Sequence, residues 1–245
     1  MIEIDPLKNI RIVLCETGHP GNIGAAARAL KTMGLSQLLL VNPQRFPDPE
    51  AQWRASRATD VLTGARVCAS LDEALSGVAL AVACSARSRE IAVPEVTARA
   101  AATQLVAVAH AQPVALVFGN ETYGLTTEEA NKCRMIATIP ANPEYSSLNL
   151  AAAVQVFAYE LRMAAGAAMP RGKPRTMASH EEIEGFYAHL EQTMVEAGFF
   201  DPGHPKKLMP RLRRLFARAQ LEKEEVNILR GILKALSQPK KRNKP

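Results

Sequence analysis

The sequence predicts an α/β protein: a mainly parallel sheet with helices on both faces, followed by a small all-helical C-terminal extension. Over the first two thirds of the 245 residues, short aliphatic runs alternate with Ala-rich or amphipathic stretches. Polar segments follow most of the aliphatic runs, as expected when a ligand binds at the carboxyl ends of parallel strands. Beyond residue 165 the aliphatic runs give way to amphipathic, basic stretches.

The individual elements follow from these aliphatic runs and amphipathic stretches. Aliphatic runs typical of buried strands are Ile10–Cys15, Gln37–Val41, Ala79–Cys84, Val114–Phe118 and Met135–Ile139. Stretches with helical spacing are Asn22–Met33, Leu71–Leu75, Val96–Ala109, Thr126–Cys133 and Ser147–Ala164. The polar segments that follow strands are Glu16–Asn22, Ser85–Arg89, Gly119–Gly124 and Pro140–Asn149.

The C-terminal third carries the basic excess. From Pro170 to Pro245, sixteen Lys and Arg stand against nine Asp and Glu, a net charge of +7, whereas the whole chain has +6. A basic appendage favours a polyanionic partner, nucleic acid first, over a surface that only aids solubility. We expect a core domain over residues 1–165, a linker over 166–179, a helical extension that binds nucleic acid over 180–237, and a basic disordered tail over 238–245.

Three helices are expected in the extension, namely His180–Glu196, Lys206–Ala219 and Leu221–Leu236. At about 100° per residue, the second combines a basic and an apolar stripe. The basic stripe, expected to contact phosphates, consists of Lys207, Arg211, Arg214 and Arg218. The apolar stripe, expected to pack on the protein, consists of Leu208, Leu212, Leu215 and Phe216. Pro210 fits best in the first turn of this helix.

The composition predicts a soluble, cytoplasmic protein. Cys15, Cys68, Cys84 and Cys133 form no CxxC pair, and three of them lie in or beside apolar runs, which is typical of free thiols in a reducing compartment. The N-terminus is too polar for a signal peptide, and no apolar run approaches the ~20 residues of a membrane span.

The first polar segment is a Gly-rich turn that runs into a helix. Its glycines allow close backbone approach to a ligand, and the amides at the helix start favour a phosphate. The spacing is not GxGxxG, which argues against a nicotinamide-dependent dehydrogenase. Asn22 and Arg28 are six residues apart and do not share a helix face, so they converge only if Asn22 stays in the turn. Arg28 is equally open to being an ordinary surface arginine.

Two further segments carry polar side chains at strand ends. Glu121 follows the abrupt strand end at Gly119 and is placed to accept hydrogen bonds from a ligand or a cation, although a plain turn before a helix cap also fits. In the last segment Ser146 or Ser147 is suited to cap the next helix, whereas Asn149 is not needed for that helix and favours a functional role.

Taken together, the patterns NxGxxxR from Asn22, FGNExxGL from Phe118 and IPxxxxxxSLN from Ile139 resemble the three motifs of the SPOUT class of RNA methyltransferases. The resemblance covers about Ile10–Ala165 and implies a C-terminal trefoil knot. NIRIVLCET, ANPEYSSLNLAAAVQVFAYELRMA, LRRLFARA and VNILRGIL are similar to the TrmJ type, which methylates the ribose 2′-hydroxyl of cytidine or uridine 32 in the tRNA anticodon loop.

This resemblance implies S-adenosylmethionine as cofactor, tRNA as partner and a homodimer, with Arg28 reaching toward the cofactor of the other subunit. Residues that match the family's cofactor-binding positions are Cys84, Ser85, Ala86, Gly119, Ile139, Ser146, Ser147 and Leu148. Residues that match its catalytic constellation are Asn22, Arg28, Glu121, Ser147 and Asn149. The extension would then bind tRNA.

A ribose hydroxyl must lose its proton as the methyl group transfers, and of the five histidines only His19 lies in a motif. A guanidinium with a pKa above 12 is a costly base, so we expect Arg28 to stabilise the alkoxide and grip a phosphate, oriented by Glu121 and Asn149. Two alternatives stay open: a ribosomal RNA 2′-O-methyltransferase, and an RNA-binding knot without catalysis. The C-terminal helices favour the tRNA enzyme.

Overall fold

The structure is a computed structural model that describes residues 5–86, 93–166 and 176–237. Within these ranges one seven-stranded sheet has the order β3-β2-β1-β6-β4-β7-β5, and all six strand pairings are parallel. The strands are β1 (Ile10–Cys15), β2 (Gln37–Val41), β3 (Arg66–Cys68), β4 (Leu80–Cys84), β5 (Glu95–Thr97), β6 (Val114–Phe118) and β7 (Met135–Thr138). The predicted mainly parallel sheet is confirmed.

The five strands predicted from the sequence are the five inner ones, whereas both edge strands were missed. β3 and β5 have three residues each and are partly exposed, so neither shows the continuous apolar run of a buried strand. Val96 and Thr97 were assigned to a helix. They pair with β7 instead, and the helix begins only at Ala98, because the Thr97 side chain caps it by accepting from the amide of Ala100.

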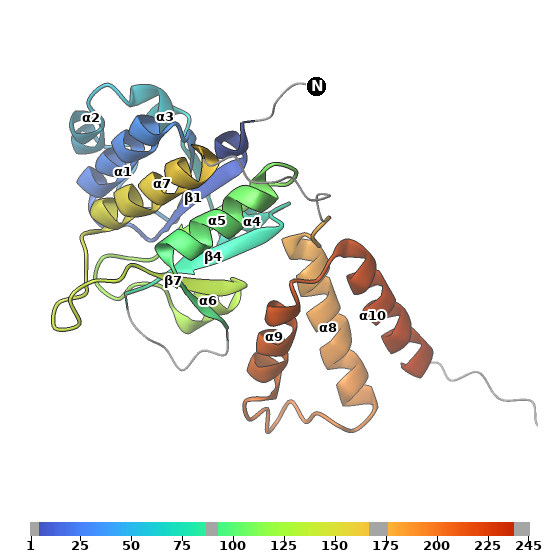
Figure 1. Cartoon of the computed structure of the whole chain (residues 1–245). Helices are drawn as coiled ribbons and strands as arrows, with labels where there is room; N and C mark the ends of the chain where they lie inside the picture. The colour runs from blue at the N-terminus through green and yellow to red at the C-terminus, as the bar shows by residue number, and fades with distance from the viewer. Residues whose placement is uncertain (1–4, 87–92, 167–175, 238–245) are drawn as a thin grey trace, which may run out of the picture.

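Helices cover both faces of the sheet (Figure 1), as predicted. One face packs against a 3-10 turn and three helices, η1 (Pro6–Asn9), α1 (Pro20–Met33), α5 (Ala98–Ala109) and α7 (Leu150–Gly166). The other packs against the short helices α4 (Leu71–Leu75) and α6 (Thr127–Asn131). Side chains alternate between the two cores along β1, since Ile12 and Leu14 face one and Val13 and Cys15 the other.

Two short helices that the sequence did not reveal, α2 (Pro49–Ala55) and α3 (Thr59–Thr63), lie outside α1. α1 and α2 approach closely because Gly24 has no side chain. A Cβ atom on Gly24 would lie 2.0 Å from the backbone oxygen of Ala51. Pro43, Pro47 and Pro49 stand before or at the start of α2, and such a proline-rich stretch is typical of a loop.

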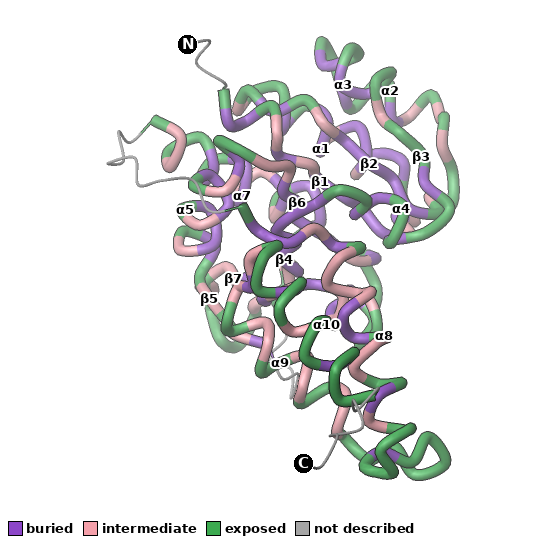
Figure 2. The backbone as a smooth tube through the Cα atoms, turned by 90° about the vertical axis from the view of Figure 1, so that its right-hand side faces the viewer, coloured by how far each residue is buried: buried purple, intermediate pink, exposed green. Residues whose placement is uncertain are grey.

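The extension is a layer of three helices, α8 (His180–Glu196), α9 (Leu208–Ala219) and α10 (Lys223–Ser237). Phe186, Tyr187 and Val226 lie in its small core, and Phe216 packs against that core. Arg213 makes a two-pronged ion pair with Glu184, with both N–O distances at 2.7 Å, and lies over the Tyr187 ring at 4.4 Å. Figure 2 shows that α9 and α10 are far more exposed than the helices on the sheet.

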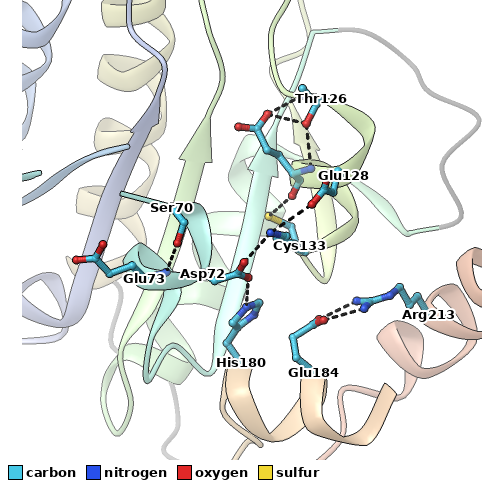
Figure 3. A network of polar contacts seen from close by, with 11 residues as sticks. Ser70, Asp72, Glu73, Thr126, Glu128, Cys133, His180, Glu184 and Arg213 are labelled. Atoms are coloured by element: carbon cyan, nitrogen blue, oxygen red, sulfur yellow. Dashed lines mark hydrogen bonds and ion pairs between the residues drawn. The ribbon is translucent and has the colours of Figure 1, made fainter. Parts of the chain in front are cut away.

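Asp72 of α4 joins the extension to the sheet layer (Figure 3). Its carboxylate contacts Lys132 at 2.7 Å and the ring of His180, the first residue of α8, at 3.1 Å. Nearby, Arg134 donates to the carbonyl of Ala178 at 2.7 Å. Burial lowers the pKa of Arg134 to about 10. A polar seam of this kind holds the extension in one orientation through directional contacts.

Most details predicted for the extension are confirmed. α8 has the predicted bounds, and Pro210 lies in the first turn of α9. Leu215 is a correction, because it is 49% exposed and does not pack on the protein. Most of the predicted linker and the whole predicted tail lie outside the described residues, so the domain boundaries stay predictions, as does the knot.

The structure also bears on two predictions that were made from composition. All four cysteines are free; Cys15, Cys68 and Cys133 are buried, and Cys84 is half-buried. No helix in the described ranges is long and apolar enough to cross a membrane.

The approach of α1 and α2 gives a first prediction. Gly24→Ala forces the helices apart, which costs about 1–3 kcal/mol of unfolding free energy and lowers Tm by roughly 2–10 °C. Gly231→Ala in α10 is the matched control, because no atom lies within 4 Å of its added Cβ. It should leave Tm unchanged or raise it through better helix propensity. Equal Tm shifts of the two variants in thermal unfolding would contradict the packing argument.

Candidate active site

Three polar loops meet at the carboxyl ends of the inner strands. The loop after β1 enters α1, the loop after β6 leads to α6, and the loop after β7 leads to α7. Parallel strands bring these ends to one edge of the sheet, which is the usual ligand position in such folds. The motifs therefore converge as the sequence predicted.

An open cleft with about 800 Å³ of empty space, its mouth included, lies among these loops. Phe118, Leu150 and Phe157 give it an apolar side, and the two rings pack edge to face at 5.5 Å. Ser85 and Thr122 are among its polar lining residues. All eight residues predicted to bind the cofactor line the cleft: Cys84, Ser85, Ala86, Gly119, Ile139, Ser146, Ser147 and Leu148.

Glu121 fastens the first loop to the second. One carboxylate oxygen accepts from the amide of Gly18 at 2.9 Å. The other accepts from the amide of His19 at 3.2 Å and from the side-chain amide of Asn22 at 2.8 Å. Burial raises the pKa of Glu121, but the hydrogen bonds from Asn22, Gly18 and His19 outweigh it, so the net pKa is lowered. Glu121 is therefore a carboxylate at neutral pH.

Asn22 connects the first loop to the third loop as well. Its side-chain oxygen accepts from the side-chain nitrogen of Asn149 at 3.0 Å. The side-chain oxygen of Asn149 accepts in turn from the amides of Ala151 and Ala152, at 3.0 and 3.3 Å. Asn149 thus caps α7, and the expectation that Ser146 or Ser147 caps this helix is wrong. Because Asn149 also holds Asn22, the structural and the functional explanations for it apply together.

A second set of hydrogen bonds between the first and second loops was not predicted from the sequence. Asn120 is buried, and its side chain donates to the backbone oxygen of Glu16 at 2.6 Å and accepts from the amide of Thr122 at 2.8 Å. Tyr123 donates its hydroxyl to the Glu16 carboxylate. Glu16 itself has a left-handed backbone, with φ of 49°. A polar residue directly beside the motif glutamate was the only signal in the sequence.

Arg28 does not join this network within one chain. It is exposed on α1, and within the described ranges its side chain has no hydrogen-bond or ion-pair partner. Asn22 lies inside the first turn of α1, so the two side chains stay on different faces. Glu121 and Asn149 hold Asn22, and the expectation that they orient Arg28 is not met in this chain. Ser147 lines the cleft.

His19 has a structural role. Its Nδ1 accepts from the amide of Gly21 at 3.1 Å and so caps α1, while its Nε2 lies 3.7 Å from Glu50. The lone pair on Nδ1 is therefore engaged in this helix cap. Among the described residues no cluster of His, Cys, Asp or Glu is suited to a metal ion.

The predicted basic stripe of α9 lies on the surface. Lys207, Arg211, Arg214 and Arg218 are all exposed, and none has a side-chain partner within the described ranges. Arg213 differs, because its ion pair and ring contact place it inside the extension. The helical spacing in the sequence had placed these four surface residues on the basic stripe and had left Arg213 out of it.

Comparisons with known proteins agree with this geometry. Residues 9–159 match the model of the SpoU rRNA methylase family, and residues 181–245 match the model of the C-terminal domain of the tRNA methyltransferase TrmJ. The tRNA (cytidine/uridine-2′-O-)-methyltransferase TrmJ of Escherichia coli (strain K12) is 52% identical, over 97% of this chain and 99% of that protein.

Solved structures show the same fold. The crystal structure of TrmJ from Z. mobilis ZM4 superposes with a TM-score of 0.81 at 35% identity, covering 93% of this chain and 99% of that one. The SpoU methyltransferase AviRb from Streptomyces viridochromogenes, in complex with the cofactor AdoMet, has a TM-score of 0.51 at 22% identity, covering 62% of this chain and 58% of that one. The predicted class and type are confirmed, and the chain belongs to the SpoU methylase family and, within it, to the TrmJ group.

Proposed function

We propose that this protein transfers a methyl group from S-adenosylmethionine to the ribose 2′-hydroxyl of cytidine or uridine 32 in the anticodon loop of tRNA. One observation carries the proposal: the cleft is lined by every residue predicted to bind the cofactor, and the Glu121 network lies at its edge. The name of the E. coli relative supports the 2′-oxygen of tRNA as the target.

The cleft fits the proposed cofactor. The apolar side near Phe118 and Phe157 suits an adenine ring, and the serines at 85, 146 and 147 suit the ribose and amino-acid groups. When bound, S-adenosylmethionine supplies an electrophilic methyl group on a sulfonium.

The chain's own residues position the acceptor. Glu121 keeps the first loop against the cleft, and Asn22 and Asn149 fix the start of α1 relative to α7. The exposed guanidinium of Arg28 is suited to a phosphate and to the alkoxide that develops on the ribose. Since Arg28 lies outside the network of its own chain, we propose a homodimer in which it serves the cleft of the other subunit.

The division of the chain follows the same logic. We propose that residues 1–165 form the methyltransferase domain and residues 180–237 a tRNA-binding domain, with the exposed stripe of α9 on the phosphates, and that the protein acts in the cytoplasm. The alternative, methylation of ribosomal RNA, fits the broader family, but the match over residues 181–245 favours tRNA.

A methylation assay tests the proposal. The full chain is incubated with labelled S-adenosylmethionine and unmodified tRNA, and the modified nucleotide is mapped. Label at the ribose of nucleotide 32 is the expected result. Label in a base, at another position, or only in ribosomal RNA would refute it.

Arg28→Lys tests the role of the guanidinium. Lysine keeps the charge but loses the planar fork, so we expect kcat to fall about 10²-fold, the effect of removing one donor to a developing oxyanion. The affinity for S-adenosylmethionine should not change. Arg66→Lys, on an exposed edge strand, is the control and should behave as the wild type. Near-normal turnover of Arg28→Lys at neutral pH would disprove the proposed role.

Glu121→Gln tests the fastening of the loops. Its pKa is lowered in the folded protein, so its stabilisation is present above its ordinary value of 4.5 and is lost as the pH falls through the folded value. The variant should lose about 1 kcal/mol at pH 7 and most of its turnover. Its stability should also depend less on pH below 4.5 than that of the wild type. Glu128→Gln, on the exposed side of α6, is the control; an equal effect there would contradict the prediction.

The α9 stripe is tested by salt dependence. Removing one charged group that binds a phosphate should reduce the slope of log K against log salt by roughly 0.7–0.9. We therefore expect the double variant Arg214→Gln, Arg218→Gln to bind tRNA more weakly and with a slope smaller by about 1.5. The double variant Arg230→Gln, Lys234→Gln on α10 removes the same charge elsewhere. Identical slopes for the two variants would show that α9 has no special role.

A further inference from the structure

The indole of Trp53 is exposed and takes no part in the Glu121 network. It is the only tryptophan of the chain, and it is 78% exposed on α2. Tryptophan is buried in most proteins to a large extent, so a ring presented to solvent on a helix needs an explanation.

The local packing fixes this exposure. Asp48 caps α2 by accepting from the amide of Glu50 at 2.9 Å, and Ala51 and Ala55 are fully buried against α1. Residue 53 is therefore on the opposite side of the helix from the buried alanines. The ring cannot turn inward without unpacking α2 from α1.

The charges around Trp53 are uneven. Each acidic side chain of this segment has a basic neighbour: Asp60 contacts Lys31 at 2.7 Å, Glu50 contacts His19 at 3.7 Å, and Asp48 contacts Arg45 at 4.0 Å. Three other arginines have no such partner. Within the described ranges, the exposed side chains of Arg28, Arg54 and Arg57 make no hydrogen bond or ion pair.

Arg28 belongs to the same edge of the molecule. Gly24 touches Ala51 of α2, and Lys31 binds the backbone oxygen of Arg57 at 3.0 Å. Residues 24, 28 and 31 share one face of α1 by their spacing, so Arg28 lies between these two contacts. Trp53, Arg54 and Arg57 are called the α2 patch below, and Arg28 lies beside it.

We infer that Trp53 is a stacking platform for an unpaired nucleobase of the RNA substrate, with the arginines of the α2 patch on the adjoining phosphates. The inference rests on the proposed function. Aromatic faces bind unstacked bases in single-stranded loops, and guanidinium groups bind phosphate in pairs of hydrogen bonds. An anticodon loop offers such bases beside its target ribose, whereas a paired stem does not.

A second copy of the chain fits this surface less well. The residues beside Trp53 in the chain, Gln52 and Arg54, and the nearby Arg57 are all exposed and polar, whereas the centre of a protein interface is poor in charge. A two-fold contact through the patch would also bring like charges together. Helices α2 and α9 lie in opposite halves of the molecule, as Figures 1 and 2 both show, so one large RNA would be held at two places.

Because Trp53 is the only tryptophan, its fluorescence reports on this surface alone. The wild type is titrated with an unmodified tRNA transcript, and acrylamide quenching is measured with and without the RNA. We expect tRNA to quench the indole and to shield it from acrylamide, and S-adenosylmethionine alone to do neither.

Variants supply an independent readout. Trp53→Leu removes the aromatic face and should raise the Kd for tRNA about tenfold, the effect expected when one base no longer stacks on an aromatic ring. Trp53→Phe should restore most of the binding, and Gln52→Ala on the same helix should bind as the wild type. kcat at saturating tRNA and the affinity for S-adenosylmethionine should stay unchanged.

The outcomes separate the two proposals. Methylation of tRNA with unchanged indole fluorescence and an unchanged Kd for Trp53→Leu would overturn the stacking platform and leave the proposed function intact. Shielding that grows with protein concentration in the absence of RNA would also overturn it, in favour of a second copy. If the wild type neither binds nor methylates tRNA, the proposed function falls, and the inference falls with it.

Discussion

The arrangement of the candidate site depends on one carboxylate. Glu121 receives hydrogen bonds from two backbone amides and one side-chain amide of the loop after β1. Through Asn22 and Asn149 the same network reaches the cap of α7. Three loops that are far apart in sequence are therefore fixed relative to one another. A ligand that enters the cleft meets a surface whose geometry is already set.

The distribution of charge indicates which class of partner the surface around such a cleft suits. Acidic side chains near α2 have basic neighbours, whereas arginines on α1, α2 and α9 lie exposed without partners in the described ranges. Exposed arginines without partners are suited to bind a polyanion.

Burial gives apparently similar residues different tasks. Arg213 is adjacent in sequence to Arg214, yet it pairs with Glu184 and lies over Tyr187, so it stabilises the extension. Arg214 is exposed and is left for a partner. Asn149 shows the converse, since one side chain both caps a helix and holds a site residue. A role therefore cannot be assigned to these residues from their type alone.

The sequence by itself determined the inner strands and the three-helix extension, because long apolar runs and helical periods are local properties. The resemblance of its motifs to a known family indicated the cleft residues. The tertiary structure decided the rest. The edge strands are short and partly exposed, and α2 follows a proline-rich stretch. The partners of Asn120 and Glu121 lie in a loop distant in sequence. The exposure of Trp53 depends on the packing of α2 against Gly24, a contact between distant segments that no local pattern encodes.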